Sequence, residues 1–362
     1  MRISSLELRD FRNHANLALD FASGTTTIIG RNGRGKTNIV EAINYLATLG
    51  SHRVSNDFPL LHFGSSQAVI SAAVHKDERT AKIEVEINES KQNRVTLNGS
   101  ALGRPRDILG LVHTVIFAPE DLSLVKGDPS DRRKYVDDFA TQLTPRVAAV
   151  RSAFEKVLKQ RNALLKSAGR RQLTGSARTT FEVWNEQFVQ HAAALTAARL
   201  DALQQLQPFI ESHGDAISGN TEALRASYSS KWFDVGSGDL ENQLREALEL
   251  RERDEIDRGV TLVGPHRDDI DIELTGLGAK HFASHGQSWS IALALRLATF
   301  DVLRQHHDDP ILILDDVFAE LDSRRRERLL ASLAGVEQTL VTAAVAEDVP
   351  NFLLEQTFEL AD

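Results

Sequence analysis

Eight consecutive residues near the start of this sequence have the types and spacing of a phosphate-binding loop. They fit the pattern G-x-x-x-x-G-K-[ST] and run Gly30-Arg31-Asn32-Gly33-Arg34-Gly35-Lys36-Thr37. Glycines at this spacing let the backbone curl so that its N–H groups surround a phosphate. In such a loop Lys36 reaches the β- and γ-phosphates of a nucleotide, and the Thr37 hydroxyl holds Mg²⁺. We therefore predict that residues 30–37 bind nucleotide phosphates.

This loop needs a strand before it and a helix after it. Residues 25–29 are rich in β-branched side chains, which predicts a short strand. Residues 38–46 place apolar side chains on one side of a helix. The helix would begin at the loop, where the positive end of its dipole attracts an anion.

A second segment supplies carboxylates for the metal and for the attacking water. Residues 310–314 form an apolar run, and Asp315 and Asp316 follow it directly. An apolar run without alternation is typical of a parallel strand that is covered on both faces. We predict that Asp315 helps Thr37 to hold the metal, and that Asp316 orients the attacking water. Lys36 and Asp316 are thus the predicted catalytic residues.

Two further motifs indicate the type of ATPase. A helix expected over residues 288–303 is preceded by Ser284-His285-Gly286-Gln287, and the two acids are followed by Ala319-Glu320-Leu321-Asp322. This order of motifs resembles that of the ABC-type ATPases. In that group, the signature Ser and Gly of one subunit contact the γ-phosphate that the other subunit binds. The resemblance therefore implies that Ser284 and Gly286 bind the ATP of a second copy, in an ATP-dependent homodimer.

Length and composition are those of an ordinary globular protein. The chain has 362 residues, of which 41% are hydrophobic and 26% are charged. The absence of cysteine excludes disulfides and thiolate sites and fits a cytoplasmic location. We expect no membrane association, because no signal peptide is visible and no apolar run approaches the roughly 18 residues of a membrane span. The net charge of −9 argues against a polycation that coats nucleic acid, although it allows a local basic patch.

Periodicity divides the chain into an α/β part, a helical part and a second α/β part. We predict an α/β fold in which a P-loop ABC-type ATPase head (lobe I, a mixed sheet with helices) carries an inserted helical lobe II. Lobe I would comprise residues 1–122 and 257–362, and lobe II residues 123–256. Alternation predicts strands over 3–8, 17–21, 69–74, 82–87 and 94–97, with a tight turn at Asn98-Gly99, and a hydrophobic run predicts a buried strand over 112–117.

The middle of the chain is predicted to contain a helical hairpin. Apolar residues recur at helical spacing over 131–166 and 179–210, and Pro145 is expected to divide the first stretch into two helices. A coiled-coil arm is less favoured, because neither stretch sustains enough heptads. A loop-rich stretch over 227–238 and a helix over 240–254 are expected to follow.

Longer sequence blocks resemble the RecF family of bacterial DNA replication and repair proteins, over essentially the whole chain. The blocks are residues 6–13 (LELRDFRN), 30–38, 117–122 (FAPEDL), 125–127 (VKG), 132–137 (RRKYVD), 263–269 (VGPHRDD) and 314–316 (LDD). The resemblance implies a slow ATPase whose ATP-gated dimer binds gapped DNA or junctions of single and double strands. It also implies RecR- and RecO-like partners that help to load a RecA-like recombinase in recombinational repair, replication restart and the SOS response to DNA damage. By the same resemblance, Phe11, Arg12 and Asn13 would lie near the adenine or ribose, and Asn38 would join the phosphate loop.

The chain departs from the family pattern at the signature and at a later strand. The usual signature is Ser-Gln-Gly-Gln/Glu-Gln-Arg, whereas this chain has His285, Ser288 and Trp289. The stretch over 340–345 lacks the usual acid after Thr342 and also the switch histidine of transporters. No glutamine stands where related ATPases place a metal-bridging one, although Glu120 lies nearby. These departures predict slow turnover, suited to a timed switch.

Basic residues gather where the helical part begins, and two interpretations of them stay open. They could follow DNA phosphates, or they could form a solvated helix face. Arg324-Arg325-Arg326 could be surface or a dimer contact, and His266 and Arg267 could sense the γ-phosphate, contact DNA or shape a turn. The basic residues are Lys126, Arg132, Arg133, Lys134, Arg151, Lys156, Lys159, Arg161, Lys166, Arg170 and Arg171.

Three other functions are alternatives to a DNA-bound switch. The chain could be the ATPase motor subunit of a transporter, part of a chromosome-organising complex, or a module that binds ATP only for its structure. The missing switch histidine argues against the first alternative, and the lack of a long coiled coil argues against the second.

Overall fold

The computed structural model describes residues 1–54, 56–169, 174–218, 223–234, 236, 238–319 and 321–360. Within these ranges the strands form three sheets. Glu320, in the segment that follows the acidic pair, and the basic residues Arg170 and Arg171 lie outside the described residues.

A five-stranded sheet carries the phosphate loop and the acidic pair at one edge. Its strands are all parallel, in the order β14-β3-β13-β12-β8. The carboxyl ends of parallel strands meet at one edge, so the loop after β3 and the acids at the end of β12 come close together across β13. The strands are β3 (Gly24–Ile29), β8 (Thr114–Phe117), β12 (Ile311–Asp315), β13 (Gln338–Ala343) and β14 (Gln356–Glu359).

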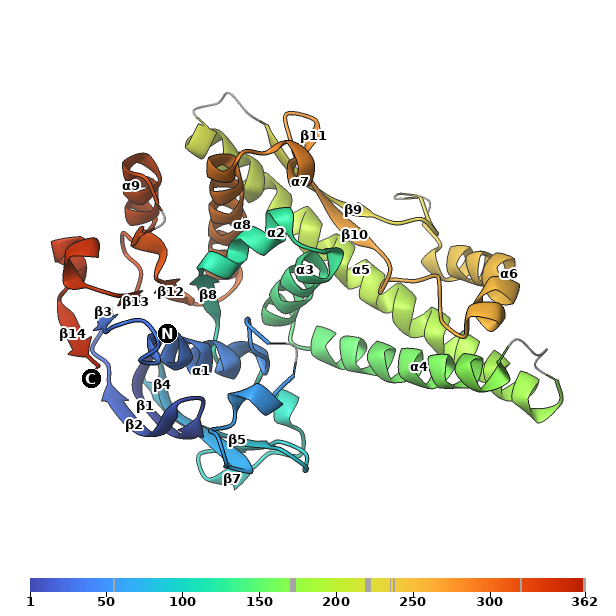
Figure 1. Cartoon of the computed structure of the whole chain (residues 1–362), viewed down its shortest axis with the longest axis horizontal. Coiled ribbons are helices and arrows are strands. Elements are labelled where there is room, and N and C mark those ends of the chain that lie inside the picture. The colour runs from blue at the N-terminus through green and yellow to red at the C-terminus, as the bar shows by residue number, and fades with distance from the viewer. Residues whose placement is uncertain are drawn as a thin grey trace.

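Helices α1 (Lys36–Thr48) and α8 (His285–His306) cover opposite faces of this sheet (Figure 1). Successive side chains of a strand point to opposite faces. In β12, Ile311 and Ile313 belong to the hydrophobic cluster that contains α1, whereas Leu312 and Leu314 belong to the cluster that contains α8. Both faces of the strand are therefore buried, which explains its unbroken apolar run. The two helices that begin at the candidate phosphate contacts thus start on different sides of the sheet.

A six-stranded antiparallel sheet covers the other side of α1. Its strand order is β2-β1-β4-β5-β6-β7, and its apolar face shares one core with α1. Asn98 and Gly99 have φ angles of 51° and 79°, so the predicted tight turn joins β6 to β7. The strands are β1 (Arg2–Phe11), β2 (His14–Asp20), β4 (Gln67–Lys76), β5 (Arg79–Asn88), β6 (Arg94–Leu97) and β7 (Ser100–Ala101).

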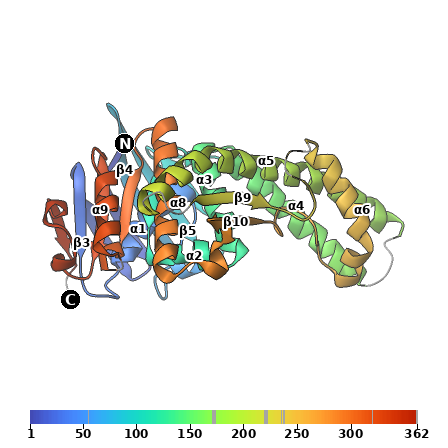
Figure 2. The same ribbon diagram turned by 90° about the horizontal axis from the view of Figure 1, so that it is seen from above.

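The middle of the chain is helical and extends away from the sheets (Figures 1 and 2). Helices α4 and α5 form the expected hairpin, and Pro145 lies between α3 and α4. Within the described ranges, no helix is long and apolar enough to cross a membrane. The division into lobes at residues 122/123 and 256/257 stays a prediction. The helices are α2 (Leu122–Lys126), α3 (Pro129–Leu143), α4 (Val147–Ala168), α5 (Ser176–Ser218), α6 (Leu240–Arg258), α7 (Ala279–Phe282) and α9 (Ser323–Ser332).

A third sheet corrects the prediction of a loop that begins at residue 227. β9 (Leu224–Ser229) pairs with β10 (Asp269–Leu274), and β10 pairs with β11 (Leu277–Gly278). Alternate residues of β9 are buried, and the strand packs on α5. The partner strand lies far along the chain, so the pairing left no local signal.

Two of the sequence blocks are bonded to each other. The Arg132 guanidinium binds the Asp269 carboxylate through Nε and Nη2, both at 2.8 Å, and Nη1 of Arg133 donates to the backbone oxygen of Asp268 at 2.7 Å. Arg132 is buried, so the hypothesis that it contacts DNA is wrong. The ammonium of Lys126 likewise binds backbone oxygens of its own chain at the end of α7.

Arg161 is buried as well. It is therefore neither a DNA contact nor part of a solvated helix face, the two interpretations that the sequence left open. Its Nη2 lies 2.5 Å from Oε2 of Glu255, and both side chains are fully buried. Nε and Nη1 donate to Asn185 and Thr261, each at 2.7 Å, so the charge is paired and hydrogen-bonded. This ion pair connects α4 to α6. Separating the two helices would leave both buried charges unpaired, which is strongly destabilising.

Replacing Arg161 by Met should lower the free energy of unfolding by about 3 kcal/mol, because Glu255 is then left buried without its partner. The matched control is Lys159→Met, an exposed change on the same helix, which should alter stability by less than about 0.5 kcal/mol. Urea unfolding followed by circular dichroism measures both. Equal stability of the two variants would contradict the role of the ion pair.

Candidate nucleotide-binding site

The phosphate loop has the backbone geometry of an anion cradle. Gly33 and Gly35 have φ angles of 86° and 95°, which glycine adopts without strain. Gly35 is also close-packed, because a Cβ there would lie 2.4 Å from Oδ1 of Asn13 and from Nε2 of His14. No side chain caps the start of α1 at Gly35. The first N–H groups of the helix therefore have no side-chain cap at Gly35. They can donate hydrogen bonds to a phosphate that binds in the loop.

Lys36 is buried and lies against the loop. Its Nζ donates to the backbone oxygen of Gly30 at 2.7 Å and to Oδ1 of Asn32 at 3.3 Å. Oδ2 of Asp316 lies 3.9 Å from the same nitrogen. The structure thus brings together the two residues predicted to be catalytic. A buried ammonium held by neutral acceptors can exchange them for phosphate oxygens.

Asp315 joins α1 to the sheet. Its Oδ1 accepts hydrogen bonds from the hydroxyls of Thr37, at 3.0 Å, and Thr342, at 2.6 Å. Burial raises the pKa of Asp315 to about 6, and the two hydroxyls oppose that rise. Sequence analysis missed Thr342, because its part in the site depends on strand pairing.

Asp316 leaves the strand in a strained conformation. Its φ angle is 51°, a left-handed value that is uncommon outside glycine, and its N–H donates to the Thr342 hydroxyl at 3.0 Å. Its side chain is one-third exposed, at 34%. The turn therefore aims a carboxylate outward beside Lys36, where it can hold a water molecule.

The oxygen donors of the site suit Mg²⁺ bound together with phosphates. Within the described ranges, no group of three or more His, Cys, Asp or Glu side chains could hold a metal by itself. Mg²⁺ commonly takes one or two protein oxygens and completes its shell with phosphate oxygens and water. The Thr37 hydroxyl and the Asp315 carboxylate fit that arrangement.

Arg12 and Asn13 border a groove of about 770 Å³ beside the phosphate loop. The Arg12 guanidinium binds both carboxylate oxygens of buried Glu41, at 2.8 and 2.6 Å. The Asn38 amide donates to Oδ1 of Asn13 at 2.7 Å. Sequence analysis did not identify Glu41. The available signal was a charged residue at a position of α1 that is flanked by apolar residues. Phe11 is fully buried and does not line this groove, and its expected place near the base stays a prediction.

Ser284 and Gly286 lie apart from the phosphate loop, at the start of α8. The Ser284 hydroxyl caps this helix by accepting a hydrogen bond from the Gln287 N–H at 3.2 Å. α8 covers the face of the sheet opposite to α1. The phosphate loop and the signature residues of one chain therefore begin on different sides of the sheet.

The turn at residues 264–268 is structural. Nε2 of His266 lies 3.2 Å from the backbone oxygen of Thr261, and the ring packs against Phe154 and Phe188. Arg267 donates to the same oxygen at 3.1 Å. Of the three interpretations made from sequence, the structure supports the shaped turn.

Comparison with known proteins agrees with this geometry. Residues 2–355 match the family model described as the RecF/RecN/SMC N-terminal domain. The DNA replication and repair protein RecF of Streptomyces avermitilis is 48% identical over 100% of this chain and 98% of its own length. RecF of Kineococcus radiotolerans is also 48% identical, over 97% of this chain and 94% of its own. The chain belongs to the RecF family.

Solved structures of the RecF family share the fold. The recombination mediator protein RecF in its ATP form matches with a TM-score of 0.89 and 28% identity, over 99% of this chain and 95% of its own. An Smc head bound to the winged-helix domain of ScpA matches with a TM-score of 0.51 at 16% identity, which speaks for the fold alone. The predicted α/β head of an ABC-type ATPase is therefore confirmed.

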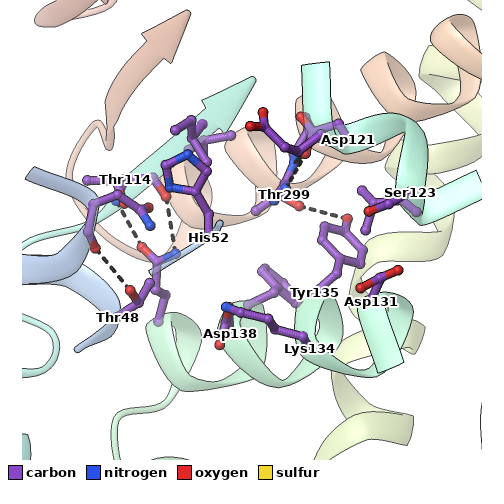
Figure 3. Close-up of a pocket in the computed structure, with 18 residues that line it drawn as sticks. Thr48, His52, Thr114, Asp121, Ser123, Asp131, Lys134, Tyr135, Asp138 and Thr299 are labelled. Carbon is purple, nitrogen blue, oxygen red and sulfur yellow. Dashed lines mark hydrogen bonds and ion pairs between the residues drawn. The ribbon is translucent and has the colours of Figure 1, made fainter. Parts of the chain in front are cut away.

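In this member of the RecF family, a pocket of about 80 Å³ lies between α1, β8, α3 and α8 (Figure 3). Thr48, His52 and Thr114 line one side of it, and Tyr135 lines the other. Among the described residues, neither ring nitrogen of His52 has a hydrogen-bond partner. Burial, assisted by the nearby Arg296, lowers the pKa of His52 to about 3. This histidine therefore packs as a neutral ring.

Replacing His52 by Leu should make the protein less sensitive to acid. The folded pKa of about 3 lies below the ordinary histidine pKa of 6.5, so the unfolded chain binds the extra proton as pH falls through 6.5. Between pH 7.5 and pH 5, wild type should lose about 2 kcal/mol more stability than the variant. Urea unfolding at both pH values measures this difference. The exposed His281→Gln serves as the control and should follow wild type, and an unchanged pH dependence in His52→Leu would contradict the assignment.

Proposed function

We propose that the protein is an ATP-dependent DNA-binding switch in which ATP joins two copies head to tail. The observation that carries the proposal is the separation of the two half-sites by the five-stranded sheet. Lys36 and Asp316 lie at one half-site, and Ser284 and Gly286 lie at the other. A second copy in reversed orientation supplies the missing half to each site, as in other ABC-type ATPases.

Each half-site has a distinct task in this proposal. The N–H groups of residues 30–38 bind the phosphates of ATP, and Lys36 exchanges its bonds to Gly30 and Asn32 for phosphate oxygens. Thr37 and Asp315 would hold Mg²⁺, which would neutralise phosphate charge when bound. Asp316 orients the attacking water. Hydrolysis is slow, because the altered signature engages the γ-phosphate weakly.

The groove beside Arg12 and Asn13 is the proposed place of the ribose and base. It adjoins Asn38, the residue that follows the phosphate loop. Phe58 and Phe63 border it with exposed rings, and an aromatic face suits a purine base.

The family relation supports DNA as the partner of the dimer. The relatives are named DNA replication and repair protein, and the matched ATP form is described as a recombination mediator in the RecFOR pathway. We propose that this dimer binds gapped DNA and acts with RecR- and RecO-like proteins to load a RecA-like recombinase. Lys156, Lys159 and Lys166 are exposed on α4 and remain candidates for phosphate contacts.

The variants Lys36→Ala and Asp316→Asn should separate ATP binding from hydrolysis. Lys36→Ala should weaken ATP binding by about 30-fold or more, through the lost charged hydrogen bonds, and should abolish the ATP-dependent dimer. Asp316→Asn should still dimerise but should hydrolyse ATP about 100-fold more slowly. Sedimentation with a labelled gapped duplex, together with phosphate release, measures both properties.

Lys91→Ala, an exposed change far from both half-sites in the sequence, is the control and should behave as wild type. The proposal fails if wild type stays monomeric on gapped DNA with ATP. DNA affinity that stays constant between about 50 and 200 mM salt would exclude phosphate contacts as its basis.

A further inference from the structure

The side chain of Arg325 lies on the first turn of α8. α9 begins after Asp322, whose carboxylate accepts the backbone N–H of Arg325 at 2.9 Å. From there the Arg325 side chain turns toward α8, where Nε donates to the Ser290 hydroxyl at 2.8 Å. Nη1 pairs with the Asp322 carboxylate. The guanidinium is thus held at the signature by two bonds of its own chain.

The remaining nitrogen, Nη2, faces Gly286. It lies 2.8 Å from the position that a Cβ on Gly286 would take. Within the described part of the chain, Nη2 has no hydrogen-bond acceptor. The open side of the signature glycine is therefore occupied by a donor with two free hydrogens.

Two cations are described near this end of α8, and they face different atoms: the Lys126 ammonium binds the backbone oxygen of Ala283 at 2.6 Å, whereas the Arg325 guanidinium lies over Gly286. Trp289 stands where the family pattern has Arg, and its side chain is buried. The first arginine within α8 is Arg296, which pairs with Asp121 at 2.5 Å. The guanidinium that lies over the signature glycine is therefore that of Arg325, from α9.

We propose that Arg325 donates to the γ-phosphate of ATP bound by a second copy, beside Ser284 and Gly286. This inference rests on the proposed head-to-tail dimer. A guanidinium offers a planar pair of N–H donors that matches phosphate oxygens. The positive end of the α8 dipole would attract the same γ-phosphate, because α8 begins at Ser284. Ser290 and Asp322 already restrain the side chain, so less conformational entropy is lost when the phosphate arrives.

The variant Arg325→Ala should weaken ATP-dependent dimerisation by about tenfold or more, the loss expected for a charged hydrogen bond. Its affinity for ADP as a monomer should stay within about twofold of wild type, because the phosphate loop of the same chain is untouched. Sedimentation equilibrium and anisotropy of labelled ADP give the two values. Arg304→Ala, at the far end of α8 and paired with Asp309, is the matched control and should dimerise as wild type.

Mixing two defective variants tests whether Arg325 acts across the dimer. A mixed dimer of Lys36→Ala and Arg325→Ala has one site that combines an intact phosphate loop with an intact Arg325. The mixture should therefore recover up to about a quarter of wild-type hydrolysis, because half of randomly formed dimers are mixed and each has one intact site. If Arg325 served its own chain, no activity would return.

Ser290→Ala distinguishes a phosphate contact from a purely structural role. It removes one bond that holds Arg325 but keeps the guanidinium, so its dimerisation should be impaired less than that of Arg325→Ala. Equal defects in these two variants, normal dimerisation of Arg325→Ala, or absence of recovery in the mixture would each overturn the inference. Failure of wild type to dimerise with ATP would instead overturn the proposed function.

Discussion

The five-stranded parallel sheet is the constraint on which the candidate site depends. Its two faces bury α1 and α8, and alternate side chains of β12 belong to one face or the other. The phosphate loop and the acids gather at its carboxyl edge, whereas the signature begins on the helix of the opposite face. The proposed need for a second copy rests on this separation, because the phosphate loop and the signature of one chain begin on different sides of the sheet.

Within one half-site, the Asp315 carboxylate links three elements. Hydroxyls from α1 and β13 reach this residue of β12, and the next N–H of the chain returns to Thr342. The raised pKa of Asp315 reflects the burial that this arrangement requires. A divalent cation would favour the charged form of the carboxylate, so metal binding and the local fold are coupled.

The sequence was sufficient for the features that are local. The phosphate loop, its strand and helix, the acidic pair and the helical hairpin all follow from short patterns, and the structure has them where they were expected. The roles of Thr342 and Glu41 could not be found in this way, since they depend on residues brought together from distant segments, and the sequence left Arg325 open as a surface residue or a dimer contact. Arg132 and Arg161 were misinterpreted for a related reason: a sequence does not reveal which basic residues have a buried carboxylate as partner.

A crosslink between copies tests the composite site most directly, because the natural chain has no cysteine. One copy would carry Arg31→Cys in the phosphate loop, and the other His285→Cys in the signature, with a short bis-maleimide as the crosslinker. Head-to-tail pairing predicts a crosslinked dimer in ATP and none in ADP. The absence of a crosslink in ATP, or a crosslink within a single chain that carries both cysteines, would contradict it.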